Sequence, residues 1–143
     1  MKSLYILFFT FIFAGLSGCG EKDTVKTEKE CPDNLACTEN FVTVSVPMVF
    51  KNISFESLSR SESSLVSSNE IIFVNEFTNN TGAIVQHAAI VNDMHLSKIK
   101  KDGSEVILRI YDKNNKKVFE DIFIIGHDCC HVEKRSGPEE IIL

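Results

Sequence analysis

Side chains that could do chemistry are concentrated near the end of this 143-residue chain, where residues 127–131 read His-Asp-Cys-Cys-His. Thiolate and imidazole groups are preferred ligands of Zn²⁺ and Cu(I), so this row could hold a metal ion. Two further cysteines, Cys31 and Cys37, lie far upstream and could instead pair with Cys129 and Cys130 as disulfides. The choice between these chemistries depends on the redox compartment, and the N-terminus indicates which compartment that is.

The N-terminus has the layout of an export signal. Lys2 supplies a positive start, and Leu4–Ala14 is an apolar run too short to span a bilayer. Leu16-Ser17-Gly18-Cys19 follows and resembles the lipobox of bacterial lipoproteins, in which the cysteine receives a diacylglyceryl group, the preceding peptide is removed and the new amino terminus is acylated. We therefore predict a signal peptide over residues 1–18 and lipidation of Cys19. Several acyl chains would anchor the protein firmly, since each buried methylene contributes about 0.8 kcal/mol.

Lipidation predicts an exported protein attached to the cell envelope. Gly20 follows the modified cysteine in place of an aspartate retention signal, which favours the outer membrane and leaves the periplasmic or surface face open. Residues 19–30 are mostly charged, a composition that predicts a disordered tether. Within it, Asp23-Thr24-Val25 resembles the Asp-Ser/Thr-aliphatic motif for O-glycosylation in Bacteroidota, and Thr24 is the candidate acceptor.

Charge and composition limit the classes of partner that this protein is expected to bind. Loss of Lys2 with the signal peptide would leave a net charge of about −6, and no basic cluster is present, so we predict no nucleic-acid partner. Without tryptophan, and with Tyr111 as its one mature tyrosine, the chain is poorly equipped to stack on sugars. The predicted partners are the membrane, through the lipid, and another envelope protein.

Four cysteines remain once Cys19 carries lipid, and an even number in an exported chain predicts disulfides. Pairing Cys129 with Cys130 would create a strained eight-membered ring, and neighbouring residues on a strand point to opposite faces. We therefore expect both to pair with Cys31 and Cys37, leaving open which pairs with which. Each bond would close a loop of roughly 90 residues, which the chain-entropy model values at about 4 to 5 kcal/mol.

A metal site is the alternative interpretation of the same region. His127, Cys129, Cys130 and His131 would be its ligands, and the function would then be metal handling or redox chemistry. Consecutive residues of an extended strand cannot all converge on one ion, however, and paired Cys-x-x-Cys motifs are missing. We accordingly predict no metal and no cofactor, with free or mixed thiols as a further alternative.

The first half of the domain alternates with the period of a β-strand. Phe41–Phe50 places five apolar side chains on one face, and Pro47 suggests an edge position. Lys51–Leu58 could continue as a second strand, and the serine-rich stretch Ser57–Ser68 is expected to be a polar loop. Ile71–Phe77 and Ala83–Val91 are expected to be strands joined as a hairpin by the turn residues 79–82.

The second half gives the clearest pattern. Residues 93–101 suit one short helical turn, and residues 106–125 form a hairpin that turns at residues 112–116. A final short strand is expected near residues 130–135, with Gly137-Pro138 as a break before Glu139–Leu143, which gives seven or eight strands with frequent turns. We predict one all-β domain over residues 31–143, an antiparallel β-sandwich of immunoglobulin-like or transthyretin-like type.

Catalytic motifs are missing from the sequence: there is no Gly-x-Ser-x-Gly, no His-Glu-x-x-His and no phosphate-binding glycine loop. We therefore predict no catalytic residues and a non-enzymatic, lipid-anchored module that binds an envelope protein or helps form a surface assembly. A small hydrolase, with a site assembled from distant residues, is a further hypothesis.

The C-terminal part carries a family resemblance. Gly103–Leu143, with its hairpin followed by Asp128–Lys134 and Ser136–Ile141, resembles the end of small Bacteroidota lipoproteins, and Cys37-Thr38 before Phe41-Val42 is similar to the start of their domain. The resemblance implies a transthyretin-like or carboxypeptidase-regulatory-like sandwich and brings neither catalytic residues nor an established function. Lys51–Val91 departs from the pattern, because it has no Asp-x-x-Gly turn after the first strand.

Overall fold

A computed structural model describes residues 31–32, 34–78 and 86–143. The predicted signal peptide, the lipidation site Cys19, the tether with Thr24 and the predicted turn at residues 79–82 lie outside these residues. Within the described part of the chain, no helix is both long and apolar enough to cross a membrane.

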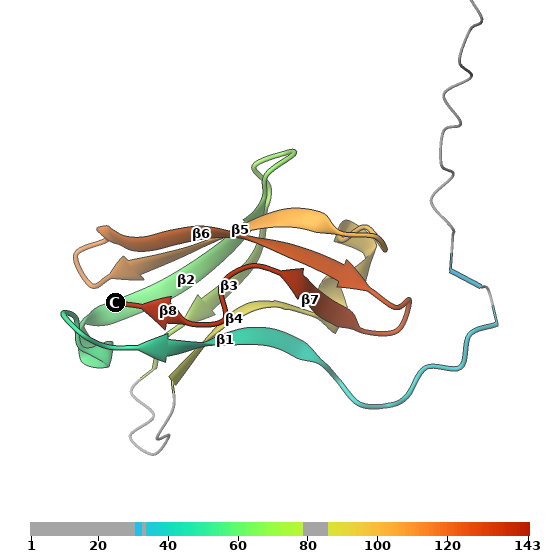
Figure 1. The fold of residues 1–143 in the computed structure, drawn as a ribbon, viewed down its shortest axis with the longest axis horizontal. Coiled ribbons are helices and arrows are strands. Elements are labelled where there is room, and N and C mark those ends of the chain that lie inside the picture. Colours follow the sequence, from blue (N-terminus) through green and yellow to red (C-terminus); the bar gives the residue numbers. More distant parts are fainter. Residues whose placement is uncertain (1–30, 33, 79–85) are drawn as a thin grey trace, which may run out of the picture.

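The described residues form two facing sheets, which confirms the predicted all-β sandwich (Figure 1). One sheet has the strand order β4-β1-β8 and the other the order β3-β2-β5-β6-β7. The strands are β1 Thr43–Val49, β2 Leu58–Leu65, β3 Ile71–Glu76, β4 Gln86–Asn92, β5 Ser104–Asp112, β6 Lys117–His127, β7 Val132–Ser136 and β8 Ile141–Ile142. Pairing is antiparallel except between β1 and β8, which run parallel.

Alternating apolar residues of both sheets meet in one core. Val44, Val46 and Met48 of β1 are buried, as their spacing predicts. The predicted hairpin is β5–β6, and its residues Val106, Leu108, Ile110, Phe123 and Ile125 are fully buried. Burial at every second position is the expected result of one sheet face covering the other.

Two short 3₁₀ helices interrupt the strands in the described residues, where the sequence predicted one helical turn. The predicted turn is η2, Asp93–Lys98, with Asn92 as its N-cap. The other is η1, Phe55–Ser57. It lies where a second strand was predicted over Lys51–Leu58, so that prediction is wrong. Ile53 and Phe55 do pack against the core, but from a loop and a helical turn.

The serine-rich stretch Ser57–Ser68 is not a loop, because residues 58–65 form β2 between β3 and β5. Ser61 and Ser63 face the core and are 1% and 0% exposed. Their register partners on β5 are Ile110 and Leu108. Large apolar neighbours thus supply the hydrophobic surface that this strand lacks. The polar composition of Ser57–Ser68 therefore suggested a loop although the segment contains a buried strand.

The predicted hairpin between Ile71–Phe77 and Ala83–Val91 is also wrong. Both strands exist, but β3 pairs with β2 in one sheet and β4 pairs with β1 in the other. The strands therefore belong to different layers, and a turn signal alone does not specify the layer to which the chain returns.

Pro47 does not mark an edge strand, because β1 lies between β4 and β8. Its position is nevertheless compatible with a missing N–H donor. β8 pairs only with Met48 and Val49, so at Pro47 the paired neighbour is His87 of β4.

Candidate functional site

The chemically interesting residues gather where the segment before β1 meets the loop between β6 and β7. Two disulfides join these segments: Cys31 to Cys129, with Cα atoms 5.6 Å apart, and Cys37 to Cys130, at 5.3 Å. The cross-pairing expected from the sequence is present, and the structure selects one of its two connectivities. Residues 34–42 contain no strand, so these covalent links hold a segment that no sheet holds.

The loop at residues 128–131 is shaped by its own polar groups. Oδ1 of Asp128 accepts hydrogen bonds from the backbone N–H groups of Cys130 (2.8 Å) and His131 (2.7 Å). These bonds hold the pKa of Asp128 below its usual value, with the His131 N–H as the largest cause. Cys129, which lies between Asp128 and Cys130, adopts a φ of +85°, a left-handed conformation that is uncommon outside glycine. The turn therefore sends Cys129 and Cys130 to separate partners.

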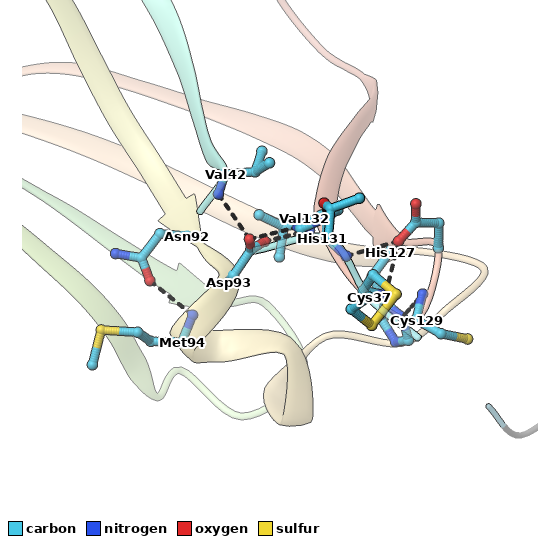
Figure 2. A network of polar contacts seen from close by, with 12 residues as sticks. Cys37, Val42, Asn92, Asp93, Met94, His127, Cys129, His131 and Val132 are labelled. Atoms are coloured by element: carbon cyan, nitrogen blue, oxygen red, sulfur yellow. Dashed lines mark hydrogen bonds and ion pairs between the residues drawn. A yellow bond between two sulfur atoms is a disulfide. The ribbon is translucent and has the colours of Figure 1, made fainter. Parts of the chain in front are cut away.

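Asp93, at the start of η2, connects this loop to β1 (Figure 2). Its carboxylate accepts the backbone N–H of Val42 (2.7 Å), the backbone N–H of Val132 (2.8 Å) and Nδ1 of His131 (2.8 Å). The backbone N–H of Asp93 in turn donates to the carbonyl oxygen of Val42 (3.1 Å). One side chain thus ties the entrance of the first strand to β7 of the opposite sheet.

Burial by itself raises the pKa of Asp93, and it is the largest single influence on that group. The hydrogen bonds from His131, Val132 and Val42 together outweigh burial, so the pKa of Asp93 lies below its usual value. The group is therefore a carboxylate at neutral pH. Because a carboxylate can only accept hydrogen bonds, Nδ1 of His131 carries a hydrogen and is the donor in its hydrogen bond with Asp93.

The other ring nitrogen of His131, Nε2, lies 2.8 Å from Oγ1 of Thr38. Thr38, His131 and Asp93 thus form a hydroxyl–imidazole–carboxylate series, the order of groups found in nucleophilic hydrolases. The sequence alone does not reveal this series, because Thr38 and His131 are 93 residues apart. Two hollows of the described surface, beside Phe77 and beside Gly103, are not lined by any of the three residues.

The predicted cluster of His127, Cys129, Cys130 and His131 does not converge on one point. Cys130 is bonded to Cys37, and His131 is held by Asp93. His127 and Cys129 do lie together, and the third member of their group is Cys31. The ligand atoms of these three residues all lie within 4.8 Å of one another. Nδ1 of His127 accepts the backbone N–H of Cys129 (3.0 Å), so that nitrogen carries a lone pair.

The chain matches no protein-family model, and neither curated proteins nor solved structures give a significant match. The resemblance to small Bacteroidota lipoproteins therefore stays a prediction, as do the lipid on Cys19 and the location in the envelope.

Proposed function

We propose that this chain is a non-enzymatic lipoprotein, anchored to the outer membrane by lipid on Cys19, whose β-sandwich binds another envelope protein. The observation that carries the proposal is the fastening of the segment before β1 by two disulfides. A pull along a tether would reach the folded domain at Cys31. The bond to Cys129 transfers that force to the β6–β7 loop instead of peeling β1 from its sheet.

The redox state of the cysteines supports export. Both bonds close loops of more than ninety residues, with sequence separations of 98 and 93. Disulfides form and persist in the periplasm and outside the cell and are rare in the cytosol. An export signal and a cross-linked domain are therefore mutually consistent.

The outer face of the five-stranded sheet supports a protein partner. Four residues lie opposite one another in register across neighbouring strands: Ile71 of β3, Ser64 of β2, Ile107 of β5 and Ile122 of β6. They form one row on the face opposite the core; Ile71 and Ile122 at its two ends are 54% and 45% exposed, Ile107 is half-buried and Ser64 is buried. Exposed apolar side chains in one row across a sheet are typical of contact surfaces.

The anchor is tested by growing cells with an alkyne fatty acid and comparing wild type with Cys19→Ala. Wild type should be labelled and sediment with membranes, whereas the variant should lose both properties. The double variant Cys37→Ser/Cys130→Ser is the matched control, because it removes two other cysteines and should keep the label. Labelling that persists in Cys19→Ala would overturn the anchor.

The partner is tested with a photocrosslinking amino acid placed at Ile122, and at Lys113 in the exposed β5–β6 turn as control. Irradiation of cells should give one reproducible crosslinked envelope protein from position 122 and none from position 113. Identical products from both positions, or none from either, would contradict a contact on this face.

The Thr38–His131–Asp93 series favours a second candidate function, hydrolysis of an ester by attack of the Thr38 hydroxyl. A fluorophosphonate probe separates the two functions. A purely structural series leaves wild type unlabelled, whereas a nucleophile gives a covalent adduct on Thr38 that His131→Gln abolishes.

A further inference from the structure

We infer that Cys31, His127 and Cys129 form a redox-gated site for Cu(I), which is closed while the Cys31–Cys129 disulfide is intact and opens when that bond is reduced. The inference goes beyond the proposed anchoring function and does not depend on the lipid. Its starting point is the convergence of two sulfur atoms and one imidazole nitrogen within 4.8 Å of one another.

The distances fit a metal once the sulfurs separate. Protein metal–sulfur bonds of about 2.3 Å at a tetrahedral angle put two thiolate ligands about 3.8 Å apart, with an imidazole nitrogen at a similar distance. The three ligand atoms already lie within 4.8 Å. Breaking the disulfide therefore requires the sulfurs to part by less than a bond length, and neither cysteine lies in a strand that would have to move.

The donor set selects the ion. Two thiolates and one imidazole are soft ligands, which favour Cu(I) over hard cations such as Mg²⁺ and Ca²⁺. Among the described residues, the group has three members and no carboxylate. With three protein donors a Zn²⁺ ion would need a water as its fourth ligand, whereas two thiolates and an imidazole complete a three-coordinate Cu(I) site.

The loop holds two of the ligands in place before any metal binds. His127 is the last residue of β6 and only 9% exposed, so the sheet fixes its backbone and burial restricts its ring. The left-handed conformation of Cys129 and its N–H bond to His127 keep the two residues together. Cys31 is an exposed residue and the bond is half-buried, so a small reductant can approach it from the Cys31 side.

The step balances with a dithiol as reductant. The dithiol supplies two electrons and two protons, becomes a disulfide itself, and converts the Cys31–Cys129 bond into two thiols. Cu(I) then displaces the two thiol protons into solvent and is held by two Sγ atoms and one His127 nitrogen. A metal bound at Nδ1 would take the lone pair that now accepts the Cys129 N–H.

The second disulfide provides a matched control. Cys37 and Cys130 join the same two segments, but His131, the residue after Cys130, is engaged by Asp93 and Thr38. Reduction of Cys37–Cys130 therefore yields two thiols without an imidazole ligand. Comparing the two double variants separates a specific site from the general affinity of thiols for copper.

The test uses the full chain, purified in detergent, reduced with a phosphine under argon and titrated with Cu(I) against a chromogenic Cu(I) chelator. Reduced Cys37→Ser/Cys130→Ser should take up one Cu(I), and its oxidised form should take up none. Adding His127→Ala to that variant should weaken binding by at least about tenfold, the lower end of the effect seen when a supporting group is lost from a metal site.

Reduced Cys31→Ser/Cys129→Ser should bind Cu(I) at least about tenfold more weakly than the matched control, by the same reasoning. Equal affinities of the two double variants, or full affinity after His127→Ala, would show that any thiol pair suffices and would overturn the site. Far-ultraviolet circular dichroism of each reduced variant identifies loss of fold, and His127→Ala in the oxidised chain keeps both disulfides as a second check. No uptake by a folded, reduced Cys37→Ser/Cys130→Ser variant would equally overturn the inference.

Discussion

Replacing Asp93 should destabilise the protein more than replacing any exposed acid. The carboxylate accepts hydrogen bonds from Val42, Val132 and His131, and its side chain is only 11% exposed. Asp93→Ala leaves two backbone N–H groups without their acceptor, at about 1–3 kcal/mol each. With the lost bond to His131, we expect the free energy of unfolding to fall by roughly 3–5 kcal/mol.

Asp93→Asn is the more informative change because it preserves shape. The asparagine amide keeps one acceptor oxygen. Its NH₂ group takes the place of the second carboxylate oxygen and faces an N–H donor, which then has no acceptor. We expect a loss of about 1–3 kcal/mol at neutral pH. Asp102→Asn makes the same chemical change at an exposed turn and should leave stability within about 0.5 kcal/mol of wild type.

The difference between wild type and Asp93→Asn should depend on pH. Because the pKa of Asp93 is lowered in the folded state, the carboxylate contributes its full stability above the unfolded pKa of about 3.9. This contribution is lost as the pH falls through the folded pKa, where wild type takes up a proton that the amide variant cannot bind. The gap between the two proteins should therefore be widest near neutrality and narrow in acid.

Urea unfolding followed by far-ultraviolet circular dichroism, with both disulfides oxidised, measures the gap at pH 7 and at about pH 3. If Asp93→Asn were as stable as wild type at pH 7, the carboxylate would not act as a clamp. If the gap were equally wide in acid, the charge of Asp93 would not be the source of its contribution.

Further predictions concern the core and one turn. Ser63→Ala removes a buried hydroxyl that has no hydrogen-bond partner among the described residues, and it should leave stability unchanged or raise it by about 1 kcal/mol. Ser64→Ala removes a 2.7 Å hydrogen bond from Arg109 and should lower stability by about 0.5–1.5 kcal/mol. Urea midpoints decide this, and the opposite order would refute it. Gly137→Ala should lower stability by more than about 1 kcal/mol, because the added Cβ would lie 2.6 Å from Cδ1 of Phe123 at a φ of +125°. A thermal midpoint equal to that of wild type would contradict the crowding.

Sequence patterns predicted the elements whose stabilising contacts are local. The β5–β6 hairpin was predicted because its strands alternate and its turn lies between them, so pairing and register both follow from neighbouring residues. β2 was missed for the opposite reason. It is buried beside Leu108 and Ile110 of another strand, and a run of serines does not indicate which residues will pair with it.

Layer assignment was not predictable from local signals. β3 and β4 are consecutive strands, and their sequences suit a hairpin, yet they lie in different sheets. Each pairs instead with a strand that precedes it in the chain: β2 for β3, and β1 for β4. That choice depends on how the apolar faces of all strands combine, which is a property of the assembled core.

The two disulfides also bring together the residues that flank the paired cysteines. Cys37 pairs with Cys130, and the next residue on each segment, Thr38 and His131, forms the adjacent contact. A cross-link between two short segments brings the flanking side chains within reach of each other, whatever fold surrounds them. His131 therefore had a sequence signal as a partner of the segment before β1. Asp93 had none, because the bonds that place it beside His131 and Val132 span 38 and 39 residues, and its sequence context announces only the start of a helical turn.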